Sequence, residues 1–132
     1  MKTDKSSLIF LLLLISTLAF SQSEVTTWQS VSIKNLRNSE MTGYVCSFRV
    51  YPGDRIQWLQ GGGELDTDFK ISSTEGILPK SGTGQVIYHI SKEGYSGTIT
   101  IQQTESKEIL LTLDLSSISS LSAYYQFSII SK

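Results

Sequence analysis

The chain has 132 residues, with 11 basic and 12 acidic side chains, a formal net charge of −1 and one cysteine. Recognition of nucleic acid or of an anionic lipid surface requires clustered positive charge, whereas the basic residues here are scattered singly, so we expect no nucleic-acid partner. The lone cysteine excludes a disulfide within the chain.

The first residues have the pattern of a secretory signal peptide. Two lysines open the chain, residues 8–15 are unbroken apolar, and Ala19 and Ser21 are small residues where a signal peptidase reads its substrate. The apolar run is shorter than the roughly 20 residues that a membrane span needs. We therefore predict a signal peptide over 1–21 and one domain over 22–132, periplasmic or secreted, with no membrane span after cleavage.

Cysteine and asparagine usage suits a bacterial exported protein. Cys46 lies among apolar residues, which predicts a buried, inert thiol. Asn35 and Asn38 lack the hydroxyl residue that an N-glycosylation site requires two positions later.

Two strands joined by a tight turn are predicted over residues 44–60. Apolar side chains take every second position, as in a half-buried strand. Pro52 presets the φ angle of one turn residue and Gly53 tolerates a positive φ at the next, which indicates a type II turn. The side chains expected to face the core are Tyr44, Cys46, Phe48, Val50, Ile56 and Trp58.

The rest of the mature chain also indicates strands and no helix. Further strands are expected over residues 25–33, 69–73, 85–91, 98–104, 108–115 and 123–131. Three glycines at 61–63 end the second central strand, and the glycine- and proline-containing stretch 75–84 is expected to be a loop. Short strands with hairpin-length links favour an antiparallel sandwich or a small barrel. Of the two, we predict a β-sandwich of about seven to eight strands, immunoglobulin-like or jelly-roll-like.

Two segments resemble the immunoglobulin fold. Cys46 and Trp58 lie at about the spacing of that family's first cysteine and core tryptophan, and Tyr124 and Tyr125 belong to a segment similar to its tyrosine corner. Gln126 stands where the second cysteine would follow. The resemblance implies a sandwich.

The residues do not indicate an assembled catalytic site. His89 is the sole histidine, it is expected to point outward, and no Gly-x-Ser-x-Gly motif is present. His89 and Cys46 on different strands do not make a zinc site. We therefore expect no enzyme, although a small glycan-active enzyme with paired carboxylates stays open.

One acidic cluster follows the three glycines. Glu64, Asp66 and Asp68 alternate in what is expected to be a loop, where their carboxylates could converge on calcium. The alternative is a solvated loop. No other cofactor is indicated.

Exposed tyrosines are the predicted ligand-binding residues. Tyr51, Tyr95 and Tyr124 are expected to face outward or to lie at a turn, where they offer a sugar ring or a protein a stacking surface. The alternative is cross-strand pairing that stabilises the sheet. We therefore predict a non-catalytic binding module for a protein or glycan of the bacterial cell envelope.

A second function remains open beside binding. Outward positions such as Thr98, Thr100 and Gln102 carry little charge, and sheet edges with little charge are poorly protected against pairing with another chain. A structural or assembly subunit of a surface structure is therefore the alternative, and the oligomeric state stays undetermined.

Overall fold

The computed structural model describes residues 24–78, 82–117 and 122–130, and the predicted signal peptide lies outside them. The described chain is all-β, as predicted, with eight strands and one short 3-10 turn, η1 (Gly61–Gly63). The strands are β1 (Thr26–Asn35), β2 (Met41–Tyr51), β3 (Arg55–Gln60), β4 (Leu65–Ile77), β5 (Gly84–Lys92), β6 (Tyr95–Gln103), β7 (Ile109–Ser117) and β8 (Ser122–Ser128). None of the described residues belongs to a helix long and apolar enough to cross a membrane.

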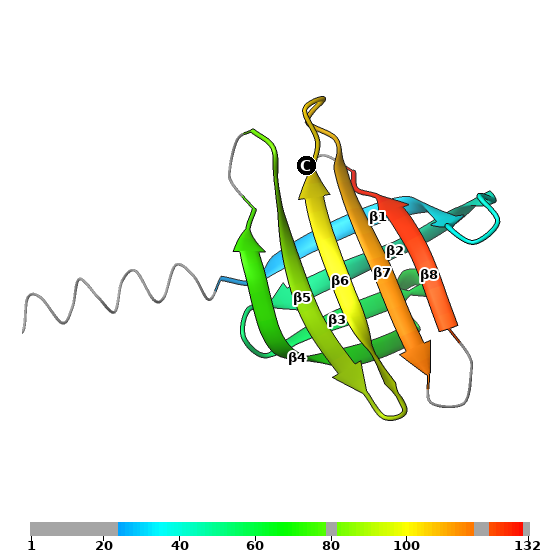
Figure 1. Cartoon of the computed structure of the whole chain (residues 1–132). Coiled ribbons are helices and arrows are strands. Elements are labelled where there is room, and N and C mark those ends of the chain that lie inside the picture. Colours follow the sequence, from blue (N-terminus) through cyan, green and yellow to red (C-terminus); the bar gives the residue numbers. More distant parts are fainter. Residues whose placement is uncertain (1–23, 79–81, 118–121, 131–132) are drawn as a thin grey trace, which may run out of the picture.

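The strands form one antiparallel sheet that closes into a barrel. Each strand pairs with the next along the chain, and β1 pairs with β8. Figure 1 shows β1–β3 behind β5–β8 and running across them, while β4 pairs with β3 through its first residues and with β5 through its last residues. The two halves of one sheet therefore face each other. The predicted pair of separate sheets is therefore corrected to a single closed sheet, and the immunoglobulin resemblance does not extend to the strand order. Alternating side chains bury one face in either architecture, so the pattern that predicted a sandwich is shared by both.

Strand β4 is the element that differs most from expectation. A short strand over residues 69–73 was expected after an acidic loop, but β4 runs over 13 residues and contains both Asp66 and Asp68. The predicted turn between β2 and β3 is confirmed: Gly53 has a φ of 74°, and the Asp54 N–H donates to the Tyr51 carbonyl at 3.0 Å. Gly61–Gly63 ends β3, as expected.

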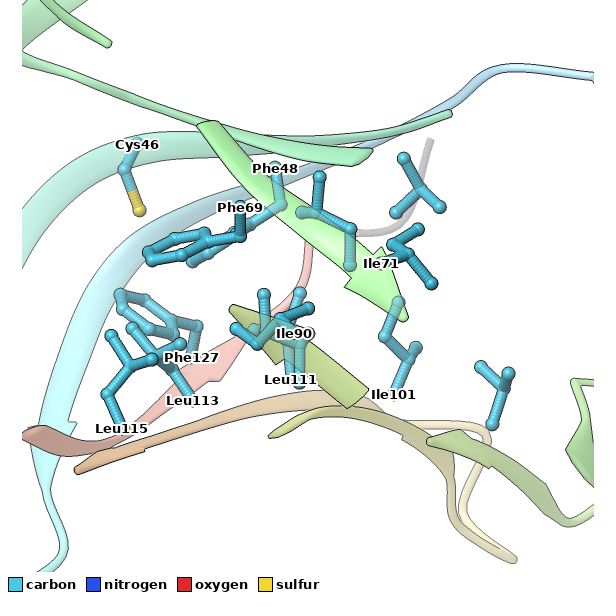
Figure 2. Packing of buried hydrophobic residues seen from close by; sticks show 14 residues of the cluster. Cys46, Phe48, Phe69, Ile71, Ile90, Ile101, Leu111, Leu113, Leu115 and Phe127 are labelled. Atoms are coloured by element: carbon cyan, nitrogen blue, oxygen red, sulfur yellow. The ribbon is translucent and has the colours of Figure 1, made fainter. Parts of the chain in front are cut away.

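The fully buried apolar side chains that fill the barrel interior come from β2–β8, and Trp28 and Ile33 of β1 pack against them while partly buried. An eight-stranded barrel is just wide enough for its own side chains to fill the middle. Phe48, Ile56, Ile99 and Phe127 have no exposed surface. Figure 2 shows the side chains of the two halves meeting across the core. The buried apolar residues are Cys46, Phe48, Val50, Ile56, Phe69, Ile71, Val86, Ile90, Ile99, Ile101, Leu111, Leu113, Leu115 and Phe127.

The seam that closes the barrel, between β1 and β8, has few backbone pairs. The ladder consists of Lys34 with Gln126 and Asn35 with Tyr125, and an isolated bridge joins Ser30 to Ile129. Between these contacts β1 carries a bulge. The buried Ser30 hydroxyl lies 2.8 Å from the Ser128 carbonyl and 2.9 Å from the Ser32 carbonyl, so it can donate to either. A side chain thus supplies a hydrogen bond at the bulge.

We expect Ser30→Ala to lower the free energy of unfolding by about 1–3 kcal/mol, because it removes a buried hydroxyl that donates a hydrogen bond to a carbonyl at the seam. Urea unfolding followed by circular dichroism measures the loss. Ser47→Ala on β2 is the matched control and should change stability by less than about 0.5 kcal/mol. Equal stability of Ser30→Ala and the native chain would show that the seam does not depend on this hydroxyl.

Candidate functional site

The three tyrosines predicted to bind a ligand do not form one surface. Tyr51, Tyr95 and Tyr124 lie on β2, β6 and β8, no two of which are neighbours in the sheet. The guanidinium carbon of Arg55 lies 3.9 Å from the centre of the Tyr51 ring and covers one of its faces. Tyr95 and Tyr124 are exposed and Tyr51 is covered by Arg55, so each remains a separate candidate for ligand binding.

The acidic residues predicted to bind calcium are also spread out. Asp66 and Asp68 lie on β4, where Asp66 accepts from the Gln57 amide at 2.8 Å and Asp68 lies 3.5 Å from the Arg55 guanidinium. Glu64 lies before the strand begins. Within the described ranges no three His, Cys, Asp or Glu side chains gather closely enough to hold a metal ion. The structure therefore does not bring this set together, and calcium binding remains a prediction.

His89 points outward, as expected, and its imidazole contacts the Glu75 carboxylate on the neighbouring strand β4. Both side chains are substantially exposed, and ion pairs of this kind contribute little to stability. No serine hydroxyl is hydrogen-bonded to the ring in the described part of the chain, since the nearby Ser72 hydroxyl donates to the His89 backbone carbonyl.

A pocket that the sequence did not predict lies where the core side chains end, at one mouth of the barrel. It has a volume of about 390 Å³. Its lining comes from β1, β2, β3, β8 and the residue that precedes β2. We call it the barrel-mouth pocket, and its lining residues are Ile33, Asn35, Glu40, Thr42, Tyr44, Trp58, Gln60 and Tyr125.

Strand alternation places three aromatic side chains at this mouth. Tyr44 lies on the same face of β2 as Phe48, and Tyr125 lies on the same face of β8 as Phe127. Both are half-buried, as is Trp58, because the barrel interior opens to solvent at this level. The inward-facing residues of these strands therefore form the core deep in the barrel and line the pocket at its mouth.

An aromatic cluster supports the pocket from below. The Phe48 and Trp58 rings stack with centres 5.5 Å apart and planes 8° apart. The Phe127 ring meets both edge to face, at 4.9 Å from Phe48 and 5.9 Å from Trp58. Aromatic pairs in these arrangements contribute about 0.5–1.5 kcal/mol beyond their buried area. Trp58 is therefore held in place by core residues while part of its surface remains available to the pocket.

Hydrogen bonds order the polar part of the pocket. The Tyr44 hydroxyl donates to the side-chain oxygen of Gln60 across β2 and β3. In the hairpin between β1 and β2, the Asn35 side-chain oxygen accepts from the Arg37 N–H at 2.9 Å, and the Asn35 N–H donates to the Glu40 carbonyl at 2.8 Å. These bonds hold a phenol, two amides and a carboxylate-bearing residue around the aromatic rings.

Below the pocket, Cys46 is buried, as predicted from its position on the strand. Burial raises the pKa of the Cys46 thiol, while the indole N–H of Trp58 acts in the opposite direction with a smaller effect. That N–H is itself buried and has no hydrogen-bond partner of standard geometry. The Cys46 sulfur is a weak hydrogen-bond acceptor and does not form a standard hydrogen bond with the indole N–H of Trp58. A thiol with a raised pKa is a poor nucleophile near neutral pH.

Cys46, which is buried, and Tyr44 and Tyr88, which are half-buried, make stability depend on pH in the alkaline range. Burial raises the pKa of Tyr44 and of Tyr88 above the ordinary 10.0, and that of Cys46 above the ordinary 9.0. The folded chain therefore holds these protons more tightly than the unfolded chain, so the stability from this source is complete below the ordinary values and is lost as the pH rises past them.

We expect the urea midpoint to fall between about pH 8 and about pH 10.5, and Tyr88→Phe to show a smaller fall because it cannot ionise. Chemical unfolding at the two pH values checks this. A midpoint that stayed constant or rose on the alkaline side would contradict the expected direction.

The chain was compared with known proteins by sequence and by structure. No protein-family model, no curated protein and no solved structure matches it. The fold and the barrel-mouth pocket are therefore the observations from which a function can be argued.

Proposed function

We propose that this chain is an exported, non-catalytic binding module of the bacterial envelope and that it binds a glycan at the barrel-mouth pocket. The observation that carries the proposal is the grouping of Tyr44, Trp58 and Tyr125 around one concavity. Ligand sites are typically concave and largely apolar, with a few placed polar groups. The export assignment rests on the residues before Gln22.

The polar groups favour a sugar over a purely apolar ligand. Gln60, Asn35 and Thr42 line the same pocket as the three aromatic rings. A sugar ring has apolar C–H faces that pack on aromatic side chains and hydroxyl groups at its edge that need hydrogen-bond partners. Amides and hydroxyls beside aromatic rings meet both requirements in one site.

Catalysis is less well supported than binding. Hydrolysis of a glycosidic bond generally uses two carboxyl groups on either side of the bond. Glu40 is the one acidic residue among those lining the barrel-mouth pocket in the described part of the chain. A single carboxylate suits ligand recognition better than it suits this reaction.

Assembly through strand exchange is also less well supported. Closing a sheet into a barrel removes the free edges at which another chain could add a strand. An assembly subunit would instead use a face, and one observation favours that alternative: Val31, Val45 and Ile130 are exposed and line one groove. Exposed apolar side chains that cluster in this way can mark an interface.

The test compares two neighbouring tyrosines of opposite orientation. Tyr125 lines the pocket, whereas Tyr124 lies on the outer face of β8 opposite Asp114. Oligosaccharides that bind the purified exported protein on a glycan array are titrated against Tyr125→Leu and Tyr124→Leu by calorimetry. We expect Tyr125→Leu to weaken binding by about tenfold or more and Tyr124→Leu to leave it unchanged.

Either of two results would contradict this site. Loss of binding in Tyr124→Leu alone would move the site to the outer tyrosines, and the absence of any bound glycan would remove the glycan proposal. Thermal unfolding of both variants confirms that they fold before binding is compared.

A further inference from the structure

One charged residue is among those that line the barrel-mouth pocket. That residue is Glu40, and no lysine or arginine is among the lining residues of the described chain. Glu40 is exposed at the rim, so its field acts partly through water. A ligand with a positive charge gains attraction at this mouth, and one with a negative charge meets repulsion that no cation in the pocket offsets.

The hydrogen bonds within the site also leave acceptors facing a ligand. The Tyr44 hydroxyl uses its hydrogen on Gln60, so what remains for a ligand is its oxygen lone pairs. The phenol is neutral near neutral pH, and burial raises its pKa further. Together with the Glu40 carboxylate, the site offers two oxygen acceptors to a ligand group that is rich in donors.

The aromatic rings favour the same kind of group. The faces of tryptophan and tyrosine rings attract cations, and clusters of such rings form binding sites for ammonium groups. Trp58, Tyr44 and Tyr125 all line the pocket. Because Trp58 and Tyr44 are also partly buried, an ammonium group that reaches them is less screened than one in open solvent.

We propose that the barrel-mouth pocket selects a sugar that carries a free, protonated amine, with Glu40 as the counter-ion and the Tyr44 oxygen as a second acceptor. This inference rests on the proposed glycan binding and specifies its ligand class. The NH2 groups of Gln60 and Asn35 then serve the ring hydroxyls, because the Gln60 oxygen accepts from Tyr44 and the Asn35 oxygen accepts from the Arg37 N–H.

The experiment uses three oligosaccharide probes of equal length: one of β-1,4-linked glucosamine, one of its N-acetylated form and one of galacturonic acid. Each is titrated against the purified exported protein by calorimetry at mildly acidic pH, where the free amine is protonated. We expect the amine form to bind about fivefold to tenfold more tightly than the acetylated form, and the acidic form to bind most weakly.

Two charge variants isolate the role of the carboxylate. Glu40→Gln should remove the preference for the amine form while binding of the acetylated form remains within about twofold. Glu105→Gln removes a carboxylate of equal charge from the connection between β6 and β7, away from the pocket lining, and should keep the preference.

The failures of the two proposals are distinguishable. Equal binding of the amine and acetylated forms, or a preference that survives Glu40→Gln, overturns the amine selectivity and leaves glycan binding in place. Tightest binding of the acidic form overturns it too. If none of the three probes binds and no other glycan does, both proposals are wrong.

Discussion

Phe48→Ala is expected to lower the free energy of unfolding by about 3–5 kcal/mol, the range measured for removing a large buried aromatic side chain. Phe48 has no exposed surface and contacts both Trp58 and Phe127 through ring packing. Its removal leaves a cavity at the centre of the aromatic cluster, where surrounding strands fixed by the closed ladder have little freedom to collapse. Domains of this size are stable by about 5–15 kcal/mol, so the loss is a large share of the total.

Val45→Ala is the matched control for this substitution. Val45 lies on the same strand three residues earlier but points outward and is 67% exposed. We expect its stability to remain within about 0.5 kcal/mol of the native value. Urea titration of both variants measures the difference, and a Phe48→Ala midpoint as high as that of Val45→Ala would show that the ring cluster is not central to the fold.

Gly97→Ala is expected to destabilise the barrel by about 3 kcal/mol or more, or to prevent folding, because it creates a backbone clash in a packed strand pair. Gly97 pairs with Leu115 of β7. A Cβ atom on Gly97 would lie 1.8 Å from the Asp114 carbonyl oxygen. Glycine within a strand often marks such a close approach of another backbone.

Gly43→Ala provides the comparison within the same molecule. Gly43 also lies within a strand, β2, but a Cβ atom there would meet nothing within 4 Å, and its φ is not in the left-handed region. We expect Gly43→Ala to be neutral or to raise stability by up to about 1 kcal/mol, since alanine restricts the unfolded chain more than glycine does. Thermal unfolding ranks the two variants, and equal melting temperatures would rule out the clash.

Much of the fold could be predicted because alternation determines which side chains face inward. Cys46, Phe48 and Val50 were expected in the core from their spacing alone, and all three are buried. Closure into a barrel could not be predicted in the same way, because it depends on the pairing of β1 with β8, which lie at opposite ends of the domain. No local pattern in either strand specifies that partner.

The candidate site was harder to predict than the fold. Tyr44 and Trp58 were expected to face the core, and their positions on the strands, like that of Tyr125, do point them inward. What the sequence does not contain is the level at which the barrel interior opens to solvent, and this level decides whether an inward side chain is buried or lines a pocket. The outward tyrosines were more conspicuous in the sequence, but the sheet separates them onto strands that do not touch.

The seam between β1 and β8 has a consequence for how the protein matures. The Ser30 hydroxyl and the Ser128 carbonyl that meet there are 98 residues apart in sequence. Contacts between residues so distant along the chain form slowly, because the loop entropy must be lost before the contact can stabilise anything. During synthesis, the edge of β1 that pairs with β8 remains unpaired until β8 has been made. A chain that cannot complete its ring until β8 is available stays an open sheet throughout its synthesis.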